Sequence, residues 1–274
     1  MDRILPDDHS KPSNSRYRCL RLGLTYLLFE ADFIPGALEQ KFHDPEDRVR
    51  LQVIRVFEHL ELQNLISIPL TTFKQLYERC SDKKIPVRAE AIEVLSKIFH
   101  KIYVQFEKSN DEAILKKFQW IPGALIDILY NGDIESKLLI EKAYFEELFS
   151  PMSEDERRAK RLAVILSLFN EKQYQGFLSI VKNQSQVMQS VKVFIEYAQR
   201  CQSDSQSESD KKVLTGIVQH LAARMPDPKK MIECLYKVAK AESDDTFDLI
   251  SAMMSPVTGY KQVIKDKVWF LLSN

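Results

Sequence analysis

The side chains that most often carry catalysis or bind metals are few and dispersed in this chain. There is no pair of cysteines two residues apart, no His-Glu-x-x-His segment and no glycine-rich phosphate loop. The histidines and cysteines are His9, His43, His59, His100, His220, Cys19, Cys80, Cys201 and Cys234. A metal site formed by His43 and His59 is an alternative, but surface or helix-capping roles are the favoured interpretation. We therefore predict no metal, no cofactor and no catalytic residue.

Paired carboxylates can act together as a general acid and a general base. Two such pairs stand out, Asp44 with Asp47 and Glu146 with Glu147. Both fall in expected turns or on exposed helical faces, without a glycine-shaped pocket or perturbing neighbours around them. Solvated charge is the favoured interpretation, so we expect that the chain is not an enzyme.

The composition is that of an ordinary water-soluble protein. Of the 274 residues, 45% are hydrophobic, and 39 basic residues balance 39 acidic ones. Without a basic excess, contact with DNA is expected to be indirect or weak at most. No apolar run reaches the roughly 18 residues of a membrane span, and the N-terminus lacks the apolar run of a signal peptide. Because scattered cysteines fit a reducing compartment, we expect a soluble intracellular protein with no membrane association.

Two segments of the chain repeat one pattern at an offset of 38 residues. Asp44 and Asp82 each follow a first apolar stretch, and Val49-Arg50 and Val87-Arg88 each open the next one. A period of this length, built from two helical stretches and an Asp-bearing turn, is typical of a stacked α-solenoid. Folds of this kind usually present a long surface to a partner.

The aspartate and the arginine of this repeat have a structural interpretation. An aspartate in a turn accepts hydrogen bonds from helix N-terminal amides, and an arginine one repeat over can bridge to it. We expect such pairs to join neighbouring repeats and to have no catalytic role. The segment Tyr17-Arg18-Cys19-Leu20-Arg21-Leu22 looks like a weaker copy of the Val-Arg motif.

The rest of the chain also has helical periodicity and no convincing alternation of strand type. We expect residues 1–14 to be disordered and residues 15–274 to form a single solenoid segment. Residues 202–210 contain no apolar side chain and are expected to form a flexible loop. Beyond the two repeats, helices are expected at about 111–118, 120–130, 134–149, 153–169, 171–182, 184–201, 209–224, 228–242, 244–254 and 257–272.

The best candidate for recognition of a partner lies at residues 128–141. Tyr130 ends one expected helix, a polar turn follows, and the next helix mixes charged side chains with leucines. An aromatic anchor with a polar rim suits a peptide partner. The candidate contact residues are Tyr130, Asn131, Asp133, Lys137 and Glu141. The alternative, favoured on physical grounds alone, buries Tyr130 and joins Lys137 to Glu141 as an i,i+4 surface pair.

Basic clusters offer a second kind of surface. Residues 157–161 are mostly basic but follow three acidic residues, so a solvated and locally compensated face is favoured over a polyanion site. Four lysine pairs lie at successive turns and would form a basic stripe only if the fold aligned them. They are Lys83-Lys84, Lys116-Lys117, Lys211-Lys212 and Lys229-Lys230.

Five segments of the chain together carry a resemblance to known proteins. They are His43-Asp44-Pro45-Glu46-Asp47-Arg48-Val49-Arg50, Asp82-Lys83-Lys84-Ile85-Pro86-Val87-Arg88-Ala89-Glu90-Ala91, Asp133-Ile134-Glu135-Ser136-Lys137-Leu138-Leu139-Ile140-Glu141-Lys142, Met225-Pro226-Asp227-Pro228 and Ser255-Pro256-Val257-Thr258-Gly259-Tyr260-Lys261-Gln262. In this order they resemble one family, the sister chromatid cohesion regulators called precocious dissociation of sisters (Pds) proteins, and the match covers most of the chain from Ser15 onward.

The resemblance implies an all-α fold, a HEAT-repeat α-solenoid, in a nuclear and chromatin-associated protein without catalytic activity. It also implies binding of the cohesin kleisin subunit through the middle repeats, which are the part that this chain matches. Cooperation with the cohesin release factor and the cohesin acetyltransferase is implied for the full-length protein. The family's releasing-factor site and inositol-phosphate pocket belong to repeats that precede the match.

The resemblance further draws attention to the helix expected near residues 89–105. There Lys97, Lys101 and Tyr103 are expected to share one face and to join the partner-binding candidates. The leading hypothesis is a cohesin-binding scaffold that regulates sister chromatid cohesion. The alternatives are a generic HEAT-repeat adaptor for another peptide or protein, and direct nucleic-acid binding along a basic edge with a steep dependence on salt.

Overall fold

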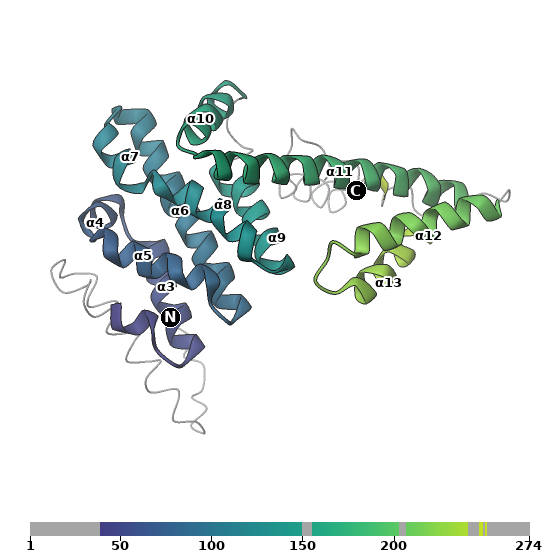
Figure 1. Ribbon diagram of the computed structural model, residues 1–274, viewed down its shortest axis with the longest axis horizontal. Helices are drawn as coiled ribbons and strands as arrows, with labels where there is room; N and C mark the ends of the chain where they lie inside the picture. The colour runs from purple at the N-terminus through teal and green to yellow at the C-terminus, as the bar shows by residue number, and fades with distance from the viewer. Residues whose placement is uncertain (1–38, 150–154, 203–206, 241–246, 249, 251–274) are drawn as a thin grey trace, which may run out of the picture. The chain divides into compact units, whose positions relative to one another are not determined.

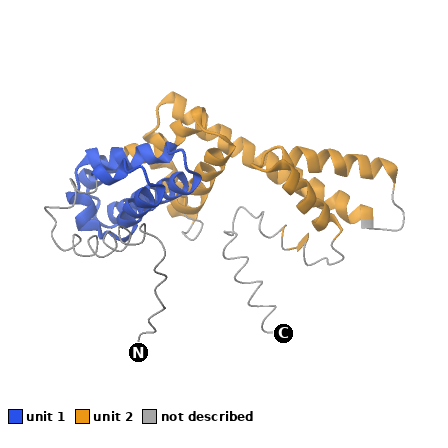
Figure 2. Cartoon of the chain, turned by 90° about the horizontal axis from the view of Figure 1, so that it is seen from below, with its two compact units in different colours: residues 1–118 blue, residues 119–274 orange. Residues whose placement is uncertain are grey.

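The computed structural model describes residues 39–149, 155–202, 207–240, 247–248 and 250. Every regular element in these ranges is a helix, which confirms the all-α prediction. The segment expected to be disordered, residues 1–14, and the helix expected at 257–272 lie outside the described residues. Contacts group the chain into two compact units, Met1–Phe118 and Gln119–Asn274 (Figure 2). The expectation of one solenoid segment from residue 15 onward stays a prediction.

The first unit contains two repeats of paired helices (Figure 1). Its elements are α3 (Asp47–His59), α4 (Leu62–Ser67), α5 (Leu70–Glu78), η1 (Arg79–Ser81), α6 (Ile85–Ser109) and α7 (Glu112–Phe118). Pro86 lies in the first turn of α6, where its missing N–H costs no hydrogen bond. The helix ends at Ser109, and the next residue, Asn110, caps it with a left-handed φ of 54°. Apolar side chains recur along α6 at three- and four-residue spacing, and Leu95 and Phe99 are fully buried.

A row of aromatic rings forms the centre of the first unit. Phe42, Phe57, Phe73 and Phe118 are all fully buried. Successive ring centroids along the row are 5.8, 5.8 and 5.0 Å apart, distances at which tilted and edge-to-face rings attract. Phe42 lies in the helical residues 39–42, and the other three rings belong to α3, α5 and α7, so the core joins both repeats of this unit.

The second unit is built around one long helix. Its elements are α8 (Trp120–Asn131), α9 (Ile134–Ala143), the π-helical turn η2 (Tyr144–Leu148), α10 (Asp155–Ser167), α11 (Glu171–Gln202), α12 (Glu208–Ala222) and α13 (Pro228–Ala239). Near the start of α11, the ring of Phe177 packs against Tyr144 and Phe149, with centroids 5.9 and 5.6 Å apart. Tyr144 is fully buried, and its hydroxyl donates to the carbonyl of Pro122 at 2.5 Å.

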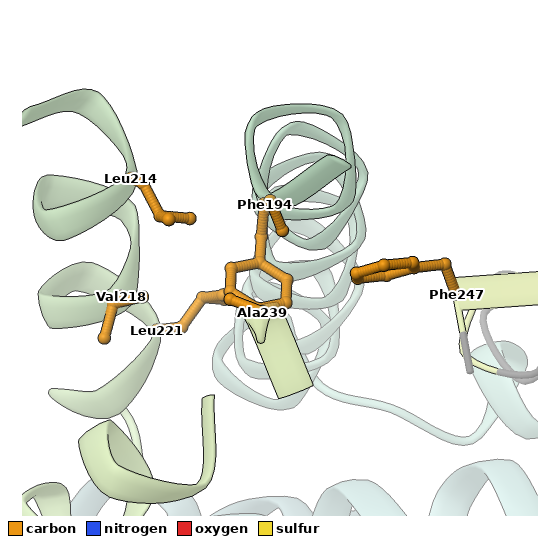
Figure 3. Packing of buried hydrophobic residues seen from close by; sticks show 7 residues of the cluster. Phe194, Leu214, Val218, Leu221, Ala239 and Phe247 are labelled. Carbon is orange, nitrogen blue, oxygen red and sulfur yellow. The ribbon is translucent and has the colours of Figure 1, made fainter. Parts of the chain in front are cut away.

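The later part of α11 forms a separate apolar cluster with α12 and α13. Figure 3 shows the ring of Phe194, on α11, between Leu214 and Val218 of α12 on one side and Phe247 on the other. Ala239, at the end of α13, belongs to the same cluster. One helix therefore contributes to two apolar clusters, first with α8 to η2 and then with α12 and α13.

The predicted break in the middle of α11 is wrong. The sequence favoured two helices, 171–182 and 184–201, whereas the structure has a single helix of 32 residues. Asn183 keeps helical geometry because its polar side chain has a partner outside the helix. Its Nδ2 donates to Glu141 Oε1 at 2.9 Å.

Two other boundaries also differ from expectation. The helix expected at 134–149 ends as α9 at Ala143 and continues as the π-helical turn η2. The expected loop at 202–210 is shorter at both ends, because Gln202 is the last residue of α11 and residues 208–210 form the first turn of α12. This turn is capped by Ser207, whose side chain accepts a hydrogen bond from the N–H of Ser209 at 3.2 Å.

Candidate functional site

The Asp-bearing turns join the two repeats of the first unit, as the sequence predicted. Arg50 donates from Nε and Nη2 to the two carboxylate oxygens of Asp82, at 2.8 and 2.9 Å. Both side chains are buried, with 4% and 2% of their surface exposed. Asp82 also accepts the N–H of Lys84, and Arg50 Nη1 donates to the carbonyls of Asp44 and Pro45. The Asp–Arg motif is therefore structural.

Lys97 and Lys101 hold the end of α3 against α6. Lys97 Nζ lies 2.6 Å from both Glu58 Oε1 and Glu93 Oε1. Burial would lower the pKa of Lys97, but its bonds to these two carboxylates raise that pKa above the ordinary value. Lys101 Nζ donates to the carbonyl of Glu58 at 2.7 Å, in the last turn of α3. Both lysines thus make contacts within the fold.

Tyr103 does not share the face of these two lysines, so that expectation is wrong. Its side chain is only 2% exposed, and its ring lies 6.1 Å from that of Phe99 and 5.9 Å from that of Phe106. Two residues along an α-helix correspond to a rotation of about 200°, which turns Tyr103 away from Lys101 and toward the core. Tyr103 contributes to packing and is too buried to contact a partner.

Tyr130, at the end of α8, is held in place and yet accessible. Its hydroxyl donates to the carbonyl of Lys172 on α11 at 2.5 Å, and the Lys172 ammonium lies 4.4 Å from the centre of its ring. The side chain remains 45% exposed, as does that of Ile134 in the first turn of α9. Asn131 is exposed as well. The alternative in which Tyr130 packs inside is therefore wrong.

The charged residues of α9 also differ from the alternative interpretation. Asp133 caps the helix by accepting the N–H of Ser136 at 2.8 Å. Glu141 accepts from Asn183, and burial raises the pKa of Glu141 against the effect of that hydrogen bond. Lys137 is exposed and makes no ion pair with any described residue, so the expected Lys137–Glu141 pair is not formed.

These side chains define the Tyr130 surface, which consists of Tyr130, Asn131, Ile134, Lys137 and Lys172. Sequence reasoning missed two of its members. An apolar residue directly after a capping aspartate is a weak signal that pointed to Ile134. Lys172 carries no signal of its own, because it lies 42 residues from Tyr130 in sequence and only the packing of α11 on α8 brings it there.

Other candidate sites find no support within the described part of the chain. It contains no group of three or more histidine, cysteine, aspartate or glutamate side chains that could hold a metal ion. None of its helices is long and apolar enough to cross a membrane. In the basic segment of α10, Arg158 lies 3.4 Å from Asp155 and Lys160 lies 2.7 Å from Glu156, as expected for a compensated face.

Comparison with known proteins gives consistent matches. Sister chromatid cohesion protein pds5 from Schizosaccharomyces pombe is 22% identical to this chain over 233 residues. These residues cover 83% of this chain and 19% of that protein. The Arabidopsis thaliana PDS5 homolog A is 26% identical over 246 residues, which cover 89% of this chain and 15% of that protein. The chain thus spans less than a fifth of the length of these relatives.

Among solved structures, a chain of the Pds5–Scc1 complex has a similar fold. The TM-score is 0.67 at 20% sequence identity, over 87% of this chain and 36% of that chain. This similarity and the helical repeats confirm the predicted HEAT-repeat α-solenoid class. The model of the family described as sister chromatid cohesion protein PDS5 matches residues 29–271. Because this match extends over most of its length, the chain belongs to the PDS5 family of sister chromatid cohesion proteins.

Proposed function

We propose that this chain is part of a cohesin-binding scaffold that regulates sister chromatid cohesion by holding the kleisin subunit, Scc1. Membership of the PDS5 family and the similarity to a chain of the Pds5–Scc1 complex support the proposal. The scaffold acts in the nucleus on chromatin and does not catalyse a reaction. The release factor and the acetyltransferase of cohesin are partners of the full-length protein.

The Tyr130 surface is the proposed kleisin contact. Tyrosine is among the residues most often found to dominate binding energy at protein interfaces. The ring of Tyr130 is already fixed by its bond to the Lys172 carbonyl, so little side-chain freedom remains to be lost on binding. Ile134, four residues later in the first turn of α9, adds exposed apolar area, since its side chain is also 45% exposed.

The charges of this surface indicate the chemistry of the bound segment. Lys137 is exposed without an ion-pair partner among the described residues, and the Lys172 ammonium lies over the ring of Tyr130. An apolar side chain against Tyr130 and Ile134, followed by an acidic one near Lys137, would be complementary. The proposed ligand is therefore a kleisin segment with adjacent apolar and acidic residues.

Binding of an N-terminal Scc1 fragment to the whole chain tests this proposal, with isothermal titration calorimetry as the measurement. Tyr130→Ala combined with Lys137→Glu is expected to weaken binding roughly 10- to 30-fold, as for the loss of an interface anchor. Tyr130→Phe keeps the ring and removes only the hydroxyl, so its effect is expected to be smaller. Circular dichroism establishes that each variant keeps its helical content.

The matched control is Lys212→Glu combined with Val213→Ala on α12, where both side chains are exposed. This pair makes the same change of charge and also removes exposed apolar surface, and it is expected to leave the affinity unchanged. If the Tyr130 and Lys137 variant binds like the wild-type protein while it remains folded, the proposed contact is wrong. If affinity capture from nuclear extract enriches other proteins without cohesin subunits, the chain is a HEAT-repeat adaptor for another partner.

A further inference from the structure

Arg224 follows the end of α12, and its guanidinium makes three contacts within the second unit. Nη1 donates to the carbonyl of His220 at 3.2 Å, one turn earlier, and lies 2.6 Å from Nε2 of the same histidine. Nε donates to Oδ1 of Asn183, on α11, at 3.4 Å. Arg224 therefore joins the end of α12 to the middle of α11.

The contact with Arg224 fixes the protonation state of His220. A guanidinium has five N–H donors and no acceptor, so the imidazole nitrogen that faces it must accept the hydrogen bond. An imidazole nitrogen accepts only when it carries no proton, and a positively charged imidazole carries a proton on both nitrogens. His220 is therefore neutral in this arrangement, with its single proton on Nδ1.

Asn183 extends this arrangement to α9. Its side-chain amide accepts from Arg224 through Oδ1 and donates through Nδ2 to Glu141 Oε1, the latter at 2.9 Å. The reversed amide would place a donor against the guanidinium and an acceptor against the carboxylate, so the two neighbours determine its orientation. One chain of hydrogen bonds thus runs from the end of α12 across α11 to α9.

Other ionisable side chains near the end of α12 lie on the two helices that pack on it, α11 and α13. They are Lys182, which precedes Asn183 on α11, and Lys229, Lys230, Glu233 and Cys234 in the first two turns of α13. All five are exposed to solvent, where charges are screened. The guanidinium of Arg224 touches the imidazole directly, so it dominates the electrostatics of His220.

We propose that His220 and Arg224 form a pH-sensitive switch, which releases the end of α12 from Asn183 when His220 takes up a second proton. Histidine is the side chain whose charge ordinarily changes between about pH 5 and pH 8. Protonation would place two donors and two positive charges 2.6 Å apart, so Arg224 must turn away and lose its bond to Asn183. The bond between Asn183 and Glu141 remains. The switch is independent of kleisin binding.

Release of Arg224 leaves the rest of α12 in place. Leu214, Val218 and Leu221 pack in the apolar cluster with Phe194 of α11, and none of these contacts involves a titratable group. The proposed change is therefore local, confined to the last turn of α12 and the residues that follow it. It changes the mobility of this helix end without unfolding the second unit.

Nitrogen-15 NMR of the histidine rings in the whole chain reads the tautomer directly. At about pH 7.5 the ring of His220 is expected to carry its proton on Nδ1 and none on Nε2. Arg224→Met keeps an unbranched stem and removes the guanidinium, so this preference for the Nδ1–H form should disappear. A ring of His220 that carries its proton on Nε2 in the wild-type protein would overturn the proposal.

Hydrogen exchange of the amides of residues 218–225 measures the release, after correction for the intrinsic effect of pH on exchange. Between about pH 7.5 and pH 5.5, protection in the wild-type protein is expected to fall about three- to fivefold, as for the loss of one partly exposed hydrogen bond. His220→Gln offers an amide oxygen to Arg224 and gains no proton, so its protection should not change with pH. Arg224→Met should have low protection at both pH values.

His59→Gln is the matched control, since His59 is an exposed histidine near the end of a helix in the first unit. It is expected to keep the wild-type pH profile at residues 218–225. The same profile in His220→Gln as in the wild-type protein would overturn the proposal. A pH-dependent fall in protection that persists in Arg224→Met would overturn it as well.

Discussion

Arg50 shows how one side chain joins two repeats. It donates four hydrogen bonds, two to the Asp82 carboxylate and two to carbonyls of the turn that precedes its own helix. Burial of two charges costs free energy, which is offset only where the geometry is good and the remaining donors and acceptors are satisfied. Both conditions hold here, so the pair fixes the register of the second repeat on the first.

Removal of one charge from this pair should strongly destabilise the first unit. Asp82→Asn keeps the shape of the side chain but leaves the guanidinium of Arg50 buried without its counter-ion. The expected loss of unfolding free energy is roughly 3–5 kcal/mol, as for other broken buried pairs. Urea denaturation followed by circular dichroism measures it.

Glu90→Gln is the matched control for that experiment. Glu90 pairs with Arg55 at 3.2 Å, but the arginine side chain is 45% exposed. Exposed pairs contribute at most about 1 kcal/mol, so the loss should be correspondingly small. Equal losses for Asp82→Asn and Glu90→Gln would show that burial of the Arg50–Asp82 pair does not matter for stability.

The Arg50–Asp82 pair also predicts that stability depends on pH. Burial would raise the pKa of Asp82, but the hydrogen bonds and charge of Arg50 and the N–H of Lys84 hold that pKa below its ordinary value. A carboxyl with a lowered folded-state pKa stabilises the protein above its unfolded value of about 3.9, and this contribution is lost as the pH falls further. The urea concentration at the unfolding midpoint of the wild-type protein should therefore fall once the pH is lowered below about 4. For Asp82→Asn this decrease should be smaller. The same dependence of the urea midpoint on pH in the wild-type protein and in Asp82→Asn would contradict a lowered pKa of Asp82.

At the scale of the elements, α11 can approach α8 closely because Gly176 has no side chain. A Cβ placed at this position would lie 2.6 Å from Ile126 Cγ2 and 3.2 Å from the hydroxyl oxygen of Tyr130. Ile126 is fully buried, and in a close-packed interior its side chain can move only by displacing its neighbours. The close approach also places Lys172 over the ring of Tyr130, so the Tyr130 surface depends on this glycine.

Two glycines in neighbouring helices should respond to alanine in opposite ways. Gly176→Ala is expected to destabilise the second unit by roughly 1–3 kcal/mol, because overpacking outweighs the better helix propensity of alanine. Gly216→Ala on α12 places its Cβ in open space and should stabilise the protein by about 1 kcal/mol. Thermal and urea denaturation of the two variants give the signs. A gain in stability for Gly176→Ala would mean that α8 and α11 are not held this closely.

At the scale of the whole molecule, the balance of charge argues against tight adhesion to nucleic acid. The 39 basic and 39 acidic residues cancel, and Lys160 and Arg158 of the most basic segment each have an acidic partner within their own helix. Affinity for DNA that does not depend on sequence requires a basic surface that releases counter-ions.

Fluorescence anisotropy with a labelled DNA duplex of random sequence checks this expectation. At about 150 mM salt, binding should be weaker than about 10 µM, whereas binding of the Scc1 fragment should change only modestly between low and moderate salt. Submicromolar DNA binding with a steep salt dependence would favour nucleic-acid recognition along a basic edge over the kleisin proposal.

The fold class and the joint between repeats were readable from the sequence because both depend on local and periodic features. Apolar spacing determines helices, and the Asp and Val-Arg motifs recur at 38 residues, so the sequence predicts that an arginine of one repeat bridges to the turn aspartate of another. The structure identifies the pair as Arg50 with Asp82. The Tyr130 region is a proposed site that rests on one aromatic residue and a polar turn. Its exposure could not be deduced in the same way.

Only the tertiary structure decided which side chains are accessible and which pairs form. Tyr103 is buried while Tyr130 is exposed, Glu141 bonds to Asn183 in place of Lys137, and α11 runs unbroken through residue 183. The bond between Glu141 and Asn183, for example, joins residues 42 positions apart through the packing of one helix on another. A helical period states which residues share a face, but the neighbouring helices determine which face is covered.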